Sequence, residues 1–223
     1  LATPPLRAGL PPAFDLLDGT DADRLFGDQW DEWFADLLER ASIDPDIATP
    51  LLRVLALGAT PTKLRDLAAA LRGHWDRLEI PSDLISQPSC DMTELVAKLD
   101  VVIALKDRST DAGDRMVIHL TMLESMTRRL SLAGDDFAAL QALAPIARRA
   151  GKPWGAFART GAAPHWPNDE LAGVRNDVAA AHQAALERFD EIATAATAAM
   201  TVELSRFVLN TAEERRRSGR LGF

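Results

Sequence analysis

Apolar side chains at helical spacing run through almost the whole chain and limit what it can fold into. Between Phe26 and Leu38 they recur at steps of three and four residues, which places them on one face of a helix. Strand-like alternation is brief, around 13–17, and tyrosine is absent. The pattern therefore predicts an all-α fold: a multi-helix domain with a long C-terminal helix.

Capping residues and prolines predict where the helices begin. Threonine is a good N-cap and proline suits the first helical position, so Thr49-Pro50 and Thr60-Pro61 each indicate a helix start. We expect helices after Thr20, after Thr49, after Thr60, from about 92 to 105, from about 111 to 130 and after Asp136. Residues 1–19 are expected to form an extended lead-in, and 168–218 one long helix or a kinked helix pair.

Composition indicates a folded protein with no membrane partner. The 223 residues are 47% hydrophobic and 26% charged, which is too apolar for a disordered chain. No apolar run approaches the ~20 residues that cross a bilayer. The first residues contain neither the basic n-region nor the apolar h-region of a signal peptide. The only cysteine, Cys90, excludes an internal disulfide. These features favour the cytoplasm.

The sequence lacks the common motifs of nucleotide-binding and hydrolase sites. We find no phosphate-binding loop, no dinucleotide-binding turn and no nucleophile elbow. Histidines stand at four positions, none with a second metal ligand at helical spacing: His74, His119, His165 and His182. We interpret them as packed or solvent-edge histidines and Cys90 as a passive thiol. A novel helical enzyme is thus poorly supported, and no catalytic residue, metal or cofactor is expected in this chain.

A basic stretch stands out in a chain of net charge −8. Residues 150–167 contain three glycines and three prolines and predict a long loop. From residue 148 to 167 there is no acidic residue, while Trp154, Phe157, His165 and Trp166 alternate with basic side chains. Such a stretch can attract phosphates and stack on bases. Our candidate DNA contacts here are Arg148, Arg149, Lys152, Trp154 and Arg159. The alternative is that both tryptophans pin the loop to the core while the basic groups stay solvated.

A second basic cluster lies at the end of the last predicted helix. Arg215 and Arg216 are further DNA-contact candidates, followed by Arg217 and Arg220. Cations also suit a helix C-terminus because they complement the helix dipole. A solvated helix end is therefore the alternative for this cluster.

Several short sequence segments resemble UvrD-like superfamily 1 DNA helicases of the UvrD/Rep type. Residues 203–207 and 212–223 resemble the helix that leads into the family's phenylalanine-aspartate-aspartate segment. Residues 6–18 resemble the stretch after the threonine-histidine-phenylalanine motif in the AddA- and RecB-like helicase–nuclease branch. Residues 71–78 and Trp166-Pro167 are also similar to that branch.

The resemblance implies a particular piece of such an enzyme. It corresponds to the helical accessory subdomain called 1B, which spans 1–223 here and helps hold single-stranded DNA or a single/double-strand junction. The parent implied is an ATP- and Mg²⁺-dependent helicase, 3′ to 5′, acting in DNA repair and recombination, with its motor domains as partners. We expect the chain to be a fragment without the ATPase motifs, so no family catalytic residue carries over. The alternative is a stand-alone helical adapter or scaffold that binds a protein partner through its long last helix.

Overall fold

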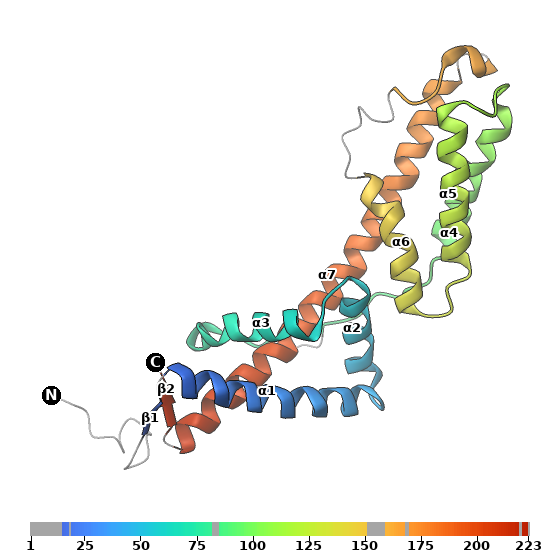
Figure 1. The fold of residues 1–223 in the computed structure, drawn as a ribbon. Coiled ribbons are helices and arrows are strands. Elements are labelled where there is room, and N and C mark those ends of the chain that lie inside the picture. Colours follow the sequence, from blue (N-terminus) through green and yellow to red (C-terminus); the bar gives the residue numbers. More distant parts are fainter. Residues whose placement is uncertain are drawn as a thin grey trace. The chain divides into compact units, whose positions relative to one another are not determined.

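The structure is a computed structural model that describes residues 15–17, 19–81, 85–150, 159–167, 170–218 and 220–222. For 15–17, 149–150 and 220–222 only the backbone is described. Most described residues are helical, which confirms the predicted all-α fold with its long C-terminal helix (Figure 1). The α-helices in these ranges are α1 (Gly19–Ala41), α2 (Pro45–Ala56), α3 (Pro61–Arg72), α4 (Thr93–Ile103), α5 (Arg115–Ser131), α6 (Asp136–Ala150) and α7 (Leu171–Ser218). The 3₁₀ helices are η2 (Trp75–Arg77), η3 (Ala104–Arg108) and η5 (Ala163–His165), and the strands are β1 (Asp15–Leu17) and β2 (Arg220–Gly222).

Contacts divide the chain into two compact units. Unit 1 comprises the described residues of 1–51, 59–85 and 197–223, and unit 2 those of 52–58 and 86–196. Helix α7 supplies its first part to unit 2 and its last part to unit 1. Each unit has its own buried side chains, and we describe each one separately.

Unit 1 is built on aromatic packing between α1 and the end of α7. The Phe207 ring centroid lies 4.8 Å from that of Trp33 and 5.8 Å from that of Trp30. Phe26 also packs on Phe207, at 5.7 Å between centroids. Since such pairs contribute about 0.5–1.5 kcal/mol each beyond area burial, this cluster accounts for the helical spacing of aromatic residues in the α1 sequence.

Strands β1 and β2 form a short parallel pair within unit 1. Asp15 is opposite Arg220, Leu16 opposite Leu221 and Leu17 opposite Gly222. A ladder of two three-residue strands is marginal alone, since stable sheets usually have more strands or a covering helix. The rest of the expected lead-in over 1–19 lies outside the described residues, apart from Gly19 at the start of α1.

Unit 2 is a helical bundle of α4, α5, α6 and the first part of α7. These helices lie alongside one another in Figure 1. Their apolar faces share one core, in which Leu120, Leu140, Leu143 and Val178 are fully buried. The chain between α6 and α7 is described from residue 159 to 167, and it carries the predicted DNA contact Arg159.

Two helix starts differ from the sequence prediction. Thr20 lies inside α1, which already begins at Gly19. Pro50 lies inside α2, which begins five residues earlier at Pro45. Asp44-Pro45 carries the same signal of a capping residue followed by proline, and the Asp44 side chain accepts from Asp46 N at 2.9 Å. The earlier signal starts the helix, although Pro50 removes one helical hydrogen bond.

Helix α3 follows the sequence prediction closely. The Thr60 hydroxyl accepts a hydrogen bond from Lys63 N at 3.2 Å, and Pro61 occupies the first turn. Helices α4 and α5 begin and end within a few residues of the expected positions, with the 3₁₀ helix η3 continuing α4. The threonine-proline signal thus predicts a start correctly where no equivalent signal precedes it.

Helix α7 is long and apolar enough to cross a membrane, judged by length and composition only. The sequence analysis expected no such segment, and the difference comes from an 18-residue stretch of which 39% is buried inside the structure. Ile192 and Ala196 are buried in unit 2, and Met200, Leu204 and Phe207 in unit 1. Packing within the protein therefore occupies these five apolar residues of α7.

Candidate nucleic-acid interface

The predicted DNA contacts fall into both units. Arg148, near the end of α6, and Arg159 are exposed and belong to unit 2. Arg215 and Arg216 lie on α7 in unit 1. The two predicted clusters therefore belong to different units. Lys152, Trp154 and the side chain of Arg149 lie outside the described residues.

Asp114 anchors the second half of the predicted basic loop to α5. Its carboxylate is the N-cap of α5, where Oδ1 accepts from Met116 N at 2.7 Å. Oδ2 accepts from Ala162 N at 2.7 Å and lies 3.0 Å from His165 Nδ1. The side chain of Asp114 is 1% exposed. One buried carboxylate thus fixes a helix start and a loop that follows 48 residues later.

These hydrogen bonds keep Asp114 ionised. Burial alone would raise its pKa, but the backbone N–H groups of Ala162 and Met116 and the imidazole of His165 outweigh burial, so the pKa lies below its ordinary value. His165 Nδ1 also lies 3.3 Å from a carboxylate oxygen of Asp111. His165 is thus paired with carboxylates, a role that its helical neighbours in the sequence could not indicate.

Arg175 holds the same loop from α7. Its Nε donates to the carbonyl oxygen of Thr160 at 2.9 Å, and an Nη donates to that of Gly161 at 3.2 Å. Gly161 has φ +84°, and a Cβ there would lie 2.9 Å from both Asp114 Oδ1 and Leu171 Cδ1. The loop therefore approaches α5 and α7 so closely that only glycine fits. Sequence reasoning missed Arg175, whose partners are backbone atoms.

Trp166 is a core residue and is not available to stack on bases. It is 4% exposed and belongs to the apolar core of unit 2. This is the alternative that the sequence left open: the tryptophan pins the loop to the bundle. The anchored part, 159–167, leaves Arg159 exposed. The second half of the basic stretch is therefore anchored to the bundle, and its cation Arg159 is exposed.

The basic cluster at the end of α7, in unit 1, contains two arginines with different surroundings. Arg216 Nε lies 3.3 Å from a carboxylate oxygen of Glu213, which also pairs with Arg217. Arg215 is half-buried, and within the part of the chain that the structure describes we find no carboxylate bound to it. Burial, and then the like charge of Arg72, hold the pKa of Arg215 below the usual arginine value. Of these two, Arg215 is the better candidate for an anion contact.

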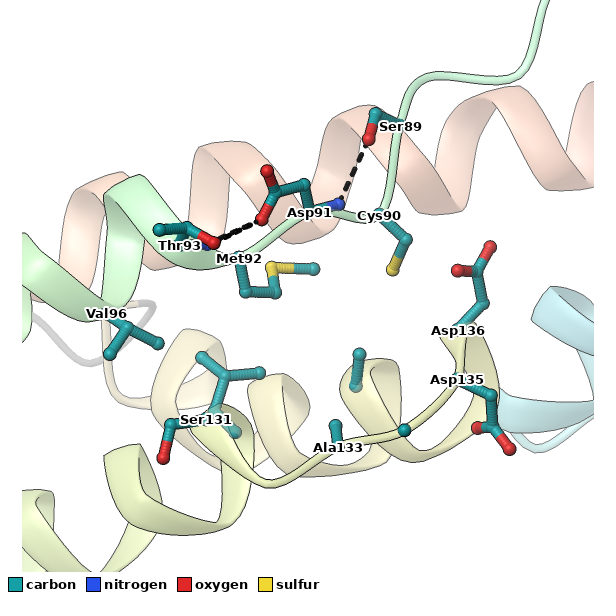
Figure 2. A pocket seen from close by; sticks show the side chains of 13 residues that line it. Ser89, Cys90, Asp91, Met92, Thr93, Val96, Ser131, Ala133, Asp135 and Asp136 are labelled. Carbon is teal, nitrogen blue, oxygen red and sulfur yellow. Dashed lines mark hydrogen bonds between the residues drawn. The ribbon is translucent and has the colours of Figure 1, made fainter.

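A separate pocket in unit 2, of about 510 Å³, is lined by groups unsuited to phosphate (Figure 2). Asp91, Asp135 and Asp136 are among its lining residues. Each has a structural partner: Asp91 accepts from Thr93 N at 2.9 Å, Asp135 from Ala138 N at 2.7 Å, and Asp136 pairs with Arg53 at 2.6 Å. The pocket is therefore an acidic surface feature apart from the basic stretch.

Cys90 lies in this pocket, beside Asp136 (Figure 2). Desolvation by burial, followed by the charge of Asp136, raises the pKa of the thiol to about 11. A thiol with so high a pKa holds little thiolate near neutral pH, and the thiolate is the nucleophile. This agrees with the interpretation of Cys90 as a passive thiol.

His119 and His182 are packed histidines, as the sequence suggested, and they contact each other. Their Nε2 atoms lie 3.0 Å apart in the interior of unit 2. Among the described residues there is no group of three or more His, Cys, Asp or Glu side chains that could hold a metal ion. His74, by contrast, is exposed.

Comparisons with known proteins add no family to this description. No protein-family model, no curated protein and no solved structure matches the chain.

Proposed function

We propose that this chain is a DNA-binding accessory module, and that the basic stretch from residue 148 to 167 is its principal contact with DNA. The observation that carries the proposal is the acid-free run of basic residues whose second half is fixed to the bundle by Asp114 and Arg175. A fixed base lowers the conformational entropy that a loop loses when it binds. Counterion release from the phosphates then supplies the affinity.

The net charge of −8 is compatible with this proposal. Electrostatic affinity for DNA depends on the cations at the contacted face, and not on the total charge. The negative remainder of the surface would instead repel DNA elsewhere and so restrict it to the basic stretch. Arg215, with Arg216 beside it, forms a second, weaker contact in unit 1.

We further propose that the parent protein is a UvrD-like DNA helicase of the AddA- and RecB-like branch, acting in repair and recombination in the cytoplasm. Residues 6–18 and 203–223, which carry the resemblance, contain the two segments that pair as β1 and β2. That pairing supports the proposal, because an inserted subdomain must leave and rejoin its parent domain at neighbouring positions. ATP, Mg²⁺ and catalysis then belong to the motor domains.

The gene tests the family proposal directly. We expect a phosphate-binding loop motif encoded upstream of this segment and an aspartate-glutamate ATPase motif encoded shortly downstream. A reading frame that holds neither motif would contradict the helicase proposal, while leaving DNA binding by this chain to be measured separately.

A binding measurement tests the DNA contact. Fluorescence anisotropy with a labelled duplex that carries a single-stranded tail should show weak binding at low salt. The variant Arg148→Ala/Arg149→Ala/Lys152→Ala should lose most of that affinity. The matched control Lys98→Ala/Arg128→Ala/Arg129→Ala removes three exposed cations elsewhere in unit 2 and should bind nearly as well as the original chain. If binding is absent at low salt, or if both variants bind equally, the basic stretch is not the contact and a protein-binding adapter becomes the better description.

A further inference from the structure

Two imidazole rings meet in the interior of unit 2, away from every predicted DNA contact. His119 on α5 and His182 on α7 are 9% and 0% exposed, and their Nε2 atoms lie 3.0 Å apart. The other ring nitrogen of His182, Nδ1, lies 3.0 Å from the carbonyl oxygen of Ile146 on α6. The pair therefore links three helices of the bundle through hydrogen bonds in the core.

These contacts limit how many protons the pair can hold. A carbonyl oxygen only accepts, so Nδ1 of His182 must carry a hydrogen. The two facing Nε2 atoms can share only one hydrogen, because a hydrogen bond needs one donor and one acceptor. The two rings together have four nitrogen atoms, each of which can carry one hydrogen. Both hydrogen bonds persist only if at most three of these four nitrogens carry a hydrogen. The folded pair thus binds at most one proton beyond the neutral state, whereas two separated histidines bind two.

The described part of unit 2 places the pair in an apolar core. The residues around it on the three helices are largely apolar and buried, among them Met116 and Leu123 on α5, Ile146 and Ala147 on α6, and Val178 and Ala185 on α7. The charged residues nearest in sequence on these helices are Arg115 on α5, Arg148 and Arg149 on α6, and Asp177 and Glu187 on α7. On α4, which packs against α5, Glu94, Lys98 and Asp100 are all exposed.

We propose that the His119–His182 pair is a pH-sensitive latch that holds α5, α6 and α7 together at neutral pH and releases them on acidification. Full protonation places hydrogens on both Nε2 atoms, so the contact between the rings becomes a repulsion. The latch contacts α6 through the hydrogen bond to the carbonyl oxygen of Ile146. Ile146 lies two residues before Arg148, where the predicted basic stretch begins. Acidification would thus loosen the attachment of that stretch. The proposal does not depend on DNA binding.

The direction of the pH effect follows from proton counting. Histidines in an unfolded chain titrate near pH 6.5, so below that pH the unfolded state binds at least one more proton than the folded pair. The one proton that the folded pair can still accept enters a buried site, and burial disfavours an imidazolium ion. Stability is therefore fully present above about pH 6.5 and falls as the pH falls. Each missing proton changes the unfolding equilibrium constant about tenfold per pH unit.

Urea unfolding at pH 7.5 and pH 5.5 tests the latch. The original chain should show an unfolding constant that rises with acidification about tenfold to a hundredfold more than that of the variant His119→Gln/His182→Gln. The control His74→Gln changes an exposed histidine and should keep the original pH response. Comparing pH responses cancels the loss of stability that the double variant shows at pH 7.5. Equal pH responses of the original chain and the double variant would overturn the proposal.

NMR of the histidine rings provides a second test if the double variant does not fold. In the folded original chain at pH 5.5, nitrogen chemical shifts should show a hydrogen on Nδ1 of His182 and only one hydrogen between the two facing Nε2 atoms. Finding His119 and His182 both doubly protonated in the folded chain would overturn the latch.

Discussion

Asp136 affects two neighbours, the buried Arg53 and the half-buried Cys90. Its carboxylate accepts two hydrogen bonds from Arg53, which is only 3% exposed, and its charge raises the pKa of the Cys90 thiol. The ion pair offsets the cost of burying a guanidinium. Burial is the larger cause of the raised pKa of the thiol, and the nearby carboxylate adds to it.

This arrangement predicts a slow thiol that one substitution accelerates. With its pKa raised from 9.0 to about 11, Cys90 should react with iodoacetamide at pH 8 about a hundred times more slowly than an ordinary thiol. Asp136→Asn removes a charge that raises this pKa and should speed the reaction severalfold, as followed by mass spectrometry. Asp135→Asn is the matched control, since asparagine can also cap α6. A rate in the Asp136→Asn variant that equals the original rate would show that burial alone suppresses the thiolate.

The sequence predicted a passive Cys90 but not its cause. Residues 90 and 136 are distant in the chain, and only the packing of the segment before α4 against the start of α6 brings them together. The same holds for His119 and His182, which are 63 residues apart. The sequence left open whether each was packed or at the solvent edge, and their contact depends on how α5 and α7 are aligned.

Among the elements, the segment 159–167 determines how the predicted basic stretch is held. It bends at Gly161, with φ +84°, between Asp114 and the first turn of α7. Loop composition correctly indicated a break in the helices, but the anchoring by Asp114 was not predictable. Asp114 has the sequence signature of an ordinary helix cap, and its second and third partners come from a distant segment.

Gly161→Ala should therefore weaken the attachment of residues 159–167 to α5 and α7. A left-handed conformation costs a residue with a side chain about 1–3 kcal/mol, and the added Cβ would also collide with Asp114 and Leu171. We expect a loss of stability at the upper end of that range in urea unfolding. Gly58→Ala has a similar φ of +93° but open space around its Cβ, so it should cost less. Equal losses in the two variants would mean that the close approach at Gly161 contributes nothing.

For the helices themselves, spacing and caps predicted most of what is observed. Thr60-Pro61 starts α3 as expected, and the predicted region of α7 forms a 48-residue helix. The error at Pro50 arose because two equal start signals stand five residues apart, and only packing distinguishes them. The division into two units was not predictable either, because α7 runs through both units and has no proline or glycine near the boundary at residues 196 and 197.

At the scale of the whole molecule, an acidic chain is proposed to bind a polyanion through one small basic region. Its net charge is −8, yet residues 148–167 carry four basic side chains and no acidic one. Binding of this kind is controlled by how many cations contact phosphates, and that number is measurable. For single-stranded DNA the logarithm of the binding constant falls with the logarithm of salt concentration with a slope of about −0.7 per contact.

The most direct test of the proposed DNA contact is this salt slope. Binding of single-stranded DNA should be measured from 20 to 200 mM salt, on the order of the range over which counterion release dominates. For Arg148→Ala/Arg149→Ala/Lys152→Ala, the slope should be smaller in magnitude by about 2 than for the original chain, since about three phosphate contacts are lost. An unchanged slope in this variant, together with a reduced slope in Lys98→Ala/Arg128→Ala/Arg129→Ala, would contradict the proposed contact and place the DNA on another face of unit 2.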